Sequence, residues 1–153
     1  MRGLWLLLIM SLAGCQHVAA PAPVNGEIRD LRSGEVLTAA QLLKRLTASE
    51  RLIIGEQHDN ADHHAAQLWL LQALGEQRQQ GSLLLEMLTP GQQPKVAAAR
   101  QMPTSADVAK ALGWQDGWDW ALYGPIVRFA LSRYLQSRLY HAEQPVLIEV
   151  PRA

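Results

Sequence analysis

The hydrophobic pattern of the chain centres on residues 52–88, where two apolar runs enclose a polar loop and an amphipathic stretch. The first run covers residues 52–54 and the second covers residues 83–85. Between them, apolar positions recur at helical spacing after Asn60, a residue suited to cap a helix N-terminus. This pattern predicts a strand, a loop, a helix and a second strand.

Acidic and histidine side chains follow both predicted strands. Glu56 and His58 lie in the loop, His63 and His64 lie in the first turn of the predicted helix, and Glu86 follows the second strand. Ligands bind outside the carboxyl ends of the strands in an open parallel sheet, so we expect these side chains to share one crevice. The positive end of the helix dipole favours neutral imidazoles in that first turn. Such imidazoles could bind a metal or donate hydrogen bonds to an anion.

The flanking segments carry local signals for further elements. Residues 26–37 alternate weakly and turn at Ser33-Gly34, which predicts a hairpin, and Thr38 with Gln41 forms a capping box that opens a helix. Weak helices are expected at residues 96–100 and 107–112, with Gly113 as the C-terminal cap. Pro125 fits the first turn of a later helix. Residues 146–150 could supply a third strand.

The N-terminus has the pattern of a targeting segment. Arg2 precedes an apolar run at residues 4–10, and no further charged residue follows until Glu27, which is typical of a secretory signal peptide. The run is too short to span a bilayer. It ends in the sequence LAGC, whose Cys15 is the single cysteine of the chain and resembles the lipidated cysteine of a bacterial lipobox. We therefore expect a signal peptide at 1–14, an acyl anchor such as palmitate on Cys15, and a flexible tether at 15–25.

Composition excludes little beyond nucleic-acid binding. The chain has 153 residues, 48% of them hydrophobic, which suits one small globular domain, and its formal net charge is zero. A neutral chain lacks the basic footprint of a nucleic-acid-binding protein.

The stretch 114–129 is rich in aromatic residues. It contains Trp114, Trp118, Trp120 and Tyr123, interleaved with Asp and Gly. Such a stretch could hold something flat and apolar, or it could be core packing, and spacing alone favours the core.

The histidine spacing gives weak support to a metal-dependent hydrolase. The loop sequence Gly55-Glu56-Gln57-His58 lacks the two histidines four residues apart that mark HExxH helices, and adjacent His63 and His64 diverge by about 100° on a helix. A zinc site is therefore possible without being signalled. The hydrolase reading predicts that Glu56→Gln abolishes a divalent-metal-dependent hydrolysis.

Several motifs in a fixed order resemble the ChaN-type haem-binding lipoprotein family. They are GEQHDN, the pair HH with Gln67, LLLEM with a following QQP, and GW-xxx-W-x-W-xx-YGPI, together covering about residues 26–129. The resemblance implies an α/β domain with a parallel sheet flanked by helices, on an outer-membrane lipoprotein of the cell envelope that serves iron uptake. It also implies ferric haem bound between the subunits of a homodimer, with tyrosine as the iron ligand and histidine assisting.

The resemblance suggests roles for the residues already singled out. Tyr123 is the candidate iron ligand, since Tyr134 and Tyr140 lie outside the matching stretch. The pocket would be lined by Glu56, His58, His63, His64 and Glu86. This implies a binding protein rather than an enzyme, with the metal-dependent hydrolase as the alternative function.

The chain also departs from the family, whose members are longer. From about residue 131 it no longer follows their pattern, so we expect a partial haem-binding domain at 26–130 and a divergent segment at 131–153. Two strands alone are too few to cover the flanking helices. The expected parallel sheet is therefore incomplete, as in a truncated member of the family.

Overall fold

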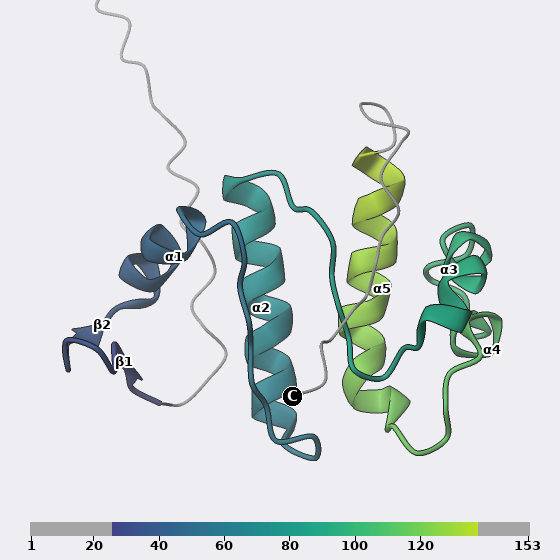
Figure 1. Cartoon of the computed structure of the whole chain (residues 1–153), viewed down its shortest axis with the longest axis horizontal. Coiled ribbons are helices and arrows are strands. Elements are labelled where there is room, and N and C mark those ends of the chain that lie inside the picture. The colour runs from purple at the N-terminus through teal and green to yellow at the C-terminus, as the bar shows by residue number, and fades with distance from the viewer. Residues whose placement is uncertain (1–25, 138–153) are drawn as a thin grey trace, which may run out of the picture.

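The structure of the protein is a computed structural model that describes residues 26–137. These residues form a mixed fold of helices with a small two-stranded antiparallel sheet (Figure 1). In chain order the elements are β1 (Ile28–Arg29), β2 (Val36–Leu37), α1 (Ala39–Thr47), α2 (Ala61–Gln77), the 3-10 turn η1 (Pro90–Gln92), α3 (Gln93–Ala99), α4 (Val108–Leu112) and α5 (Trp120–Ser137). The expected signal peptide, Cys15, the tether and the strand at 146–150 lie outside the described residues.

The local signals before residue 50 are confirmed. Strands β1 and β2 pair in antiparallel register around a turn in which Gly34 has φ +75°, a conformation that glycine adopts at little cost. At α1, the Thr38 side chain accepts from the Gln41 amide while the Gln41 side chain accepts from the Thr38 amide. This reciprocal pair is the predicted capping box.

The predicted caps of the later helices are also confirmed. Asn60 caps α2 by accepting from the backbone amides of Asp62 and His63. Gly113 ends α4 in the left-handed conformation, with φ +64°. Both follow from chemistry within a few residues of the cap.

The prediction that Pro125 opens a helix is wrong. Helix α5 begins five residues earlier, at Trp120, and contains Pro125 in its interior. Asp119 starts the helix because its carboxylate accepts from the backbone amide of Ala121 at 2.8 Å. In the interior of α5, Pro125 lacks the amide that a helix residue normally donates, and its ring crowds the carbonyl four residues earlier.

The two apolar runs do not form strands within the described residues. Residues 52–54 and 83–85 are not assigned to any element, and the described sheet consists of β1 and β2 alone. A parallel sheet is therefore absent from residues 26–137. The physical reason is that neither run has a strand beside it there to complete a ladder, and Ile53 is 96% exposed.

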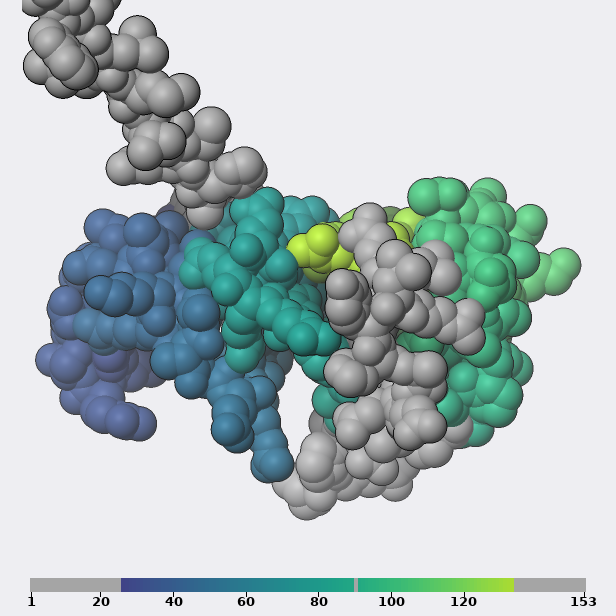
Figure 2. Space-filling view, turned by 90° about the horizontal axis from the view of Figure 1, so that it is seen from above, coloured from purple at the N-terminus to yellow at the C-terminus, as the bar shows by residue number. Residues whose placement is uncertain are grey.

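The buried residues form two hydrophobic clusters. One joins α1 to α2 through Leu43, Trp69, Ala73 and Leu74. The other gathers α3, α4, α5 and the segment before η1, with members Leu85, Met87, Val96, Ala99, Val108, Leu112, Tyr123, Val127 and Leu131. In Figure 2 the purple-to-blue hairpin with α1 and the green α3 and α4 lie at opposite ends of the molecule. Helices α2 and α5 pack against each other between these ends.

Candidate functional site

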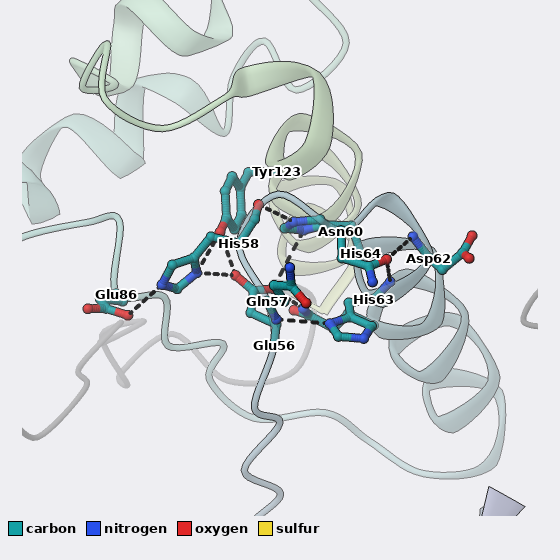
Figure 3. A network of polar contacts seen from close by, with 10 residues as sticks. Glu56, Gln57, His58, Asn60, Asp62, His63, His64, Glu86 and Tyr123 are labelled. Carbon is teal, nitrogen blue, oxygen red and sulfur yellow. Dashed lines mark hydrogen bonds and ion pairs between the residues drawn. The ribbon is translucent and has the colours of Figure 1, made fainter.

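The carboxylate of Glu56 is the centre of a polar network between α2 and α5 (Figure 3). The Tyr123 hydroxyl donates to Glu56 Oε1 at 2.5 Å, and His58 Nδ1 lies 3.0 Å from the same oxygen. The Gln67 side-chain amide donates to Oε2. Three donors from three parts of the chain therefore converge on one carboxylate.

These donors keep Glu56 ionised. Burial alone would raise its pKa, but the hydrogen bonds from Tyr123, His58 and Gln67 outweigh that effect and leave the pKa below the ordinary value of 4.5. Hydrogen bonds to the charged form of an acid favour that form. The site therefore holds a fixed negative charge behind His58 at neutral pH.

Tyr123 is the buried member of this network. It is 1% exposed, and its ring meets the His64 ring edge-on with centroids 4.4 Å apart. Burial and the hydrogen bond to Glu56 both raise the pKa of the phenol well above its ordinary value of 10.0. Tyr123 is thus held as a neutral hydrogen-bond donor, whereas the iron ligand predicted for this position would be a phenolate.

The raised pKa of Tyr123 predicts a specific alkaline titration. Because the folded pKa exceeds the unfolded value, the hydrogen-bonded phenol stabilises the fold below about pH 10, and this contribution is lost as pH rises further. The folded protein and its Tyr123→Phe variant should therefore develop the same phenolate absorbance until unfolding begins. An additional phenolate in the folded wild type near pH 10 would contradict the assignment.

Two of the three histidines in this region have their ring nitrogens engaged by the chain. The backbone amide of Gln57 donates to His63 Nδ1 at 2.9 Å, which places the proton of a neutral His63 on Nε2. His64 Nε2 lies 3.0 Å from the backbone oxygen of His58, so it carries the proton and donates. His64 Nδ1 makes no hydrogen bond and lies 3.6 Å from Glu56 Oε2, and the residue is only 4% exposed.

His58 differs from both because its side chain is half-exposed and its Nε2 accepts no hydrogen bond from the backbone of the described residues. A carboxylate can only accept, so the contact with Glu56 requires the proton on Nδ1, and the neutral ring keeps its lone pair on Nε2. The side chain is 51% exposed, and Nε2 lies 3.9 Å from Glu86 Oε2 at the rim. His58 is therefore the histidine of this loop that can offer a lone pair to a ligand from solvent.

An open aromatic groove begins beside His58. The Trp118 ring packs edge-on against His58 with centroids 5.0 Å apart. Trp118 also lines a groove of about 840 Å³ between α4 and the start of α5, whose other lining residues are Ala109, Lys110, Gly113, Trp114, Asp116, Gly117, Asp119 and Trp120. The tryptophans that spacing favoured as core are partly buried and edge the hydrophobic cluster of α3–α5. They therefore pack on the core and also line the groove.

The structure places most of the predicted site residues together and adds others. Glu56, His58, His64 and Tyr123 form one network, Glu86 stands at its rim, and His63 turns toward the backbone of Gln57. Sequence reasoning missed the structural roles of Gln67 and Trp118. A signal for Gln67 was present, since it lies three residues after His64 and shares its helix face.

Two negative findings apply to residues 26–137. No three side chains of His, Cys, Asp or Glu type are grouped there in a way that could hold a metal ion. No helix among these residues has both the length and the apolar character needed to cross a membrane.

The described residues form a small, mainly helical fold in which the largely buried Glu56 carboxylate holds the half-exposed His58 ring. A family model described as haem-binding uptake, Tiki superfamily, ChaN, matches residues 42–147, which is more than half of the chain. The chain belongs to this family. Comparisons with curated proteins and with solved structures find no match.

Proposed function

We propose that this protein binds haem and that His58 is its axial ligand. The observation that carries the proposal is the arrangement of the His58 ring, with Nδ1 held by Glu56, Nε2 3.9 Å from Glu86 Oε2, and the side chain 51% exposed. Metal-ligating histidines commonly donate their other ring nitrogen to a carboxylate, which fixes the ring and increases its basicity. Histidine is also a common axial ligand of haem iron.

The surroundings of His58 fit a flat, largely apolar group. The tryptophan-lined groove begins at Trp118, next to the His58 ring. His63 has its proton on Nε2, a position from which it could donate to a carboxylate such as a haem propionate. The haem would supply the iron, and the chain would bind and orient it.

Tyr123 would be an iron ligand only after a rearrangement. Its oxygen would have to give up the hydrogen bond to Glu56, and the phenol would have to lose a proton that the site retains. We therefore assign Tyr123 the role of positioning Glu56, which in turn positions His58.

Titration with ferric haem, followed in the Soret region and in the charge-transfer bands that report axial ligation, tests the proposal. We expect saturable binding, a His58→Ala variant that binds at least about 10-fold more weakly, and a Tyr123→Phe variant with unchanged charge-transfer bands. The matched control is His63→Ala, which should keep the ligand bands. The haem-loaded protein is expected to sediment as a dimer.

Two results would overturn parts of the proposal. Loss of phenolate-type bands in Tyr123→Phe would return the ligand role to Tyr123. A wild-type chain that is folded by circular dichroism and shows no saturable binding would reject haem binding itself. These outcomes are distinguishable because the first requires a haem complex and the second lacks one.

The contacts of Glu56 favour the haem proposal over the metal-dependent hydrolase. The three side chains that donate to Glu56 and its 9% exposed side chain fit a carboxylate that holds its neighbours in place. We therefore assign Glu56 the role of positioning His58.

We further propose a lipid anchor at Cys15 on the outer membrane of a bacterial envelope. The support is the lipobox-like sequence LAGC after an apolar run. We expect the wild-type chain in the membrane fraction and carrying labelled palmitate, and Cys15→Ser in neither state. Equal palmitate incorporation in the two proteins would reject the anchor.

We also propose that residues 52–54 and 83–85 act as strands of a parallel sheet in an α/β domain. In Figure 1 the chain runs in one direction before α2, returns along α2, and then runs in the first direction again. A strand, a helix and a parallel strand joined in this way form a βαβ unit.

A further inference from the structure

Gln92 is a buried polar residue that lies outside the Glu56 network. Three polar residues are buried in the described part of the chain, and two of them, His64 and Gln67, contact the Glu56 carboxylate. Gln92 is 7% exposed and has its partners elsewhere. A buried amide costs free energy unless it is hydrogen-bonded, so its partners show what it holds in place.

The side chain of Gln92 joins two segments of the chain. Its Oε1 accepts from the backbone amide and the hydroxyl of Thr89 at 2.9 and 3.0 Å. Its Nε2 donates to the backbone oxygens of Leu112 and Gly113 at 3.1 and 2.8 Å. A glutamine side chain offers two donors and one oxygen with two lone pairs, and all four are engaged. Gln92 therefore fastens the end of α4 to the turn that follows Glu86.

The end of α4 leads directly into the tryptophan-lined groove. Gly113 ends the helix in the left-handed conformation, and the backbone amide of Trp114 donates back to the Ala109 oxygen at 2.9 Å. Gly113 and Trp114 both line the groove. The Gly113 oxygen that Gln92 binds belongs to the peptide unit that joins Gly113 to Trp114. Gln92 thus restrains the chain where it enters the groove.

Trp114 in turn holds Trp118. The indole Nε1 of Trp114 donates to the backbone oxygen of Trp118 at 2.8 Å. Its ring also packs edge-on against Trp120, with centroids 4.9 Å apart. The Trp118 ring packs edge-on against His58 at 5.0 Å. A continuous series of contacts therefore runs from Gln92 to the proposed axial ligand.

We propose that Gln92 is a positioning residue for the tryptophan-lined groove. By holding the peptide between Gly113 and Trp114, it sets the Trp114 indole, which sets the Trp118 ring beside His58. A fully hydrogen-bonded buried amide rigidifies the segments that it joins. The effect of Gln92 on ligand binding rests on the proposed haem function, whereas its effect on Trp114 does not.

Hydrogen exchange of the Trp114 indole in the full-length chain tests this positioning without a ligand. Gln92→Leu removes all four bonds, and the matched control is Gln93→Leu, the same change at a partly buried neighbour outside these contacts. Comparison with Trp114→Phe assigns the Nε1–H signal in NMR spectra. We expect this hydrogen to exchange at least about 10-fold faster in Gln92→Leu, the order expected when net hydrogen bonds are lost. The control should match the wild type.

The backbone amide of Leu43 separates local loosening from general destabilisation. Leu43 lies in α1 and belongs to the other hydrophobic cluster, so its exchange should be unchanged by Gln92→Leu. Equal acceleration at Leu43 and Trp114, or no acceleration at Trp114, would overturn the proposal. If Gln92→Leu does not fold, Thr89→Val removes one of the four bonds at an exposed residue and should accelerate Trp114 exchange by about 3-fold. An unchanged rate in that variant would equally overturn it.

Titration of the same variants with ferric haem tests the consequence for the ligand. Gln92→Leu should bind haem at least about 3-fold more weakly, because the residues that line the site are held less firmly. Its charge-transfer bands should stay unchanged, because His58 remains in place as the ligand. Faster Trp114 exchange with wild-type haem affinity would overturn the effect on the ligand. If the folded wild type binds no haem, the haem function fails, and the exchange rates still decide whether Gln92 positions Trp114.

Discussion

Replacement of Glu56 by leucine is expected to lower the free energy of unfolding by about 2–4 kcal/mol, because it leaves buried hydrogen-bond donors without an acceptor. The Tyr123 hydroxyl and the Gln67 amide both point at this carboxylate, and Tyr123 is 1% exposed. Leucine fills a similar volume and accepts no hydrogen bond. Urea unfolding followed by circular dichroism measures the loss.

A double-mutant cycle separates this hydrogen bond from general damage. Glu56→Leu combined with Tyr123→Phe should cost less than the sum of the two single changes by about 1–3 kcal/mol, because the second change removes the stranded donor. Glu76→Leu, a change of an exposed glutamate on α2, is the matched control and should stay within about 0.5 kcal/mol of wild type. Additive single changes would show that the two residues do not interact.

The pH dependence gives a second measure of the Glu56 variant. The folded pKa of Glu56 lies below its ordinary value of 4.5, so its contribution to stability is present above pH 4.5 and is lost as pH falls through the folded value. The wild type should therefore lose stability in acid more steeply than Glu56→Leu does.

Truncation of Leu112 to alanine is expected to cost about 2–5 kcal/mol, the range for a fully buried leucine whose cavity the structure cannot refill. Leu112 is 0% exposed and lies at the end of α4, a helix of five residues. So short a helix is not stable by itself and depends on packing. The buried Gln92 adds support by donating to the backbone oxygens of Leu112 and Gly113 at 3.1 and 2.8 Å.

The control for Leu112→Ala is Leu31→Ala, which alters a 91% exposed leucine. It should change the free energy of unfolding by no more than about 0.5 kcal/mol. Urea midpoints of the two variants, measured side by side with the wild type, provide the test. Equal midpoints would mean that α4 is not part of the cooperative core.

The sequence predicted elements whose causes are local and missed those whose causes are distant. The caps at Thr38 and Asn60 and the turn at Gly34 depend on neighbouring residues, and they are present as predicted. The runs 52–54 and 83–85 have a strand pattern, but a strand also requires a partner that a local pattern cannot supply. Pro125 was misplaced because the cap of α5 at Asp119 outweighed the preference of proline for a first turn.

The candidate site was likewise predicted where the cause is local and missed where the cause is distant in the sequence. Sequence patterns grouped Glu56 with the histidines because they follow one apolar run, and the structure places them together. Which ring nitrogen of each histidine is free could not be predicted, because it depends on contacts such as that of His64 with the backbone of His58. The burial of Tyr123 also depends on the packing of α5 against α2, which lie far apart in the sequence.

The two hydrophobic clusters have a consequence for local unfolding. Helix α2 packs its buried Trp69 and Leu74 into the cluster with α1, whereas Tyr123 belongs to the cluster of α3–α5. The hydrogen bond between Tyr123 and Glu56 thus joins the loop before α2 to the cluster of α3–α5. A local opening that separates α2 from α5 would break this bond and disrupt the site. A ligand bound at the site would resist that opening. Protection of the backbone amides of α2 and α5 from hydrogen exchange should therefore rise as more of the site is occupied.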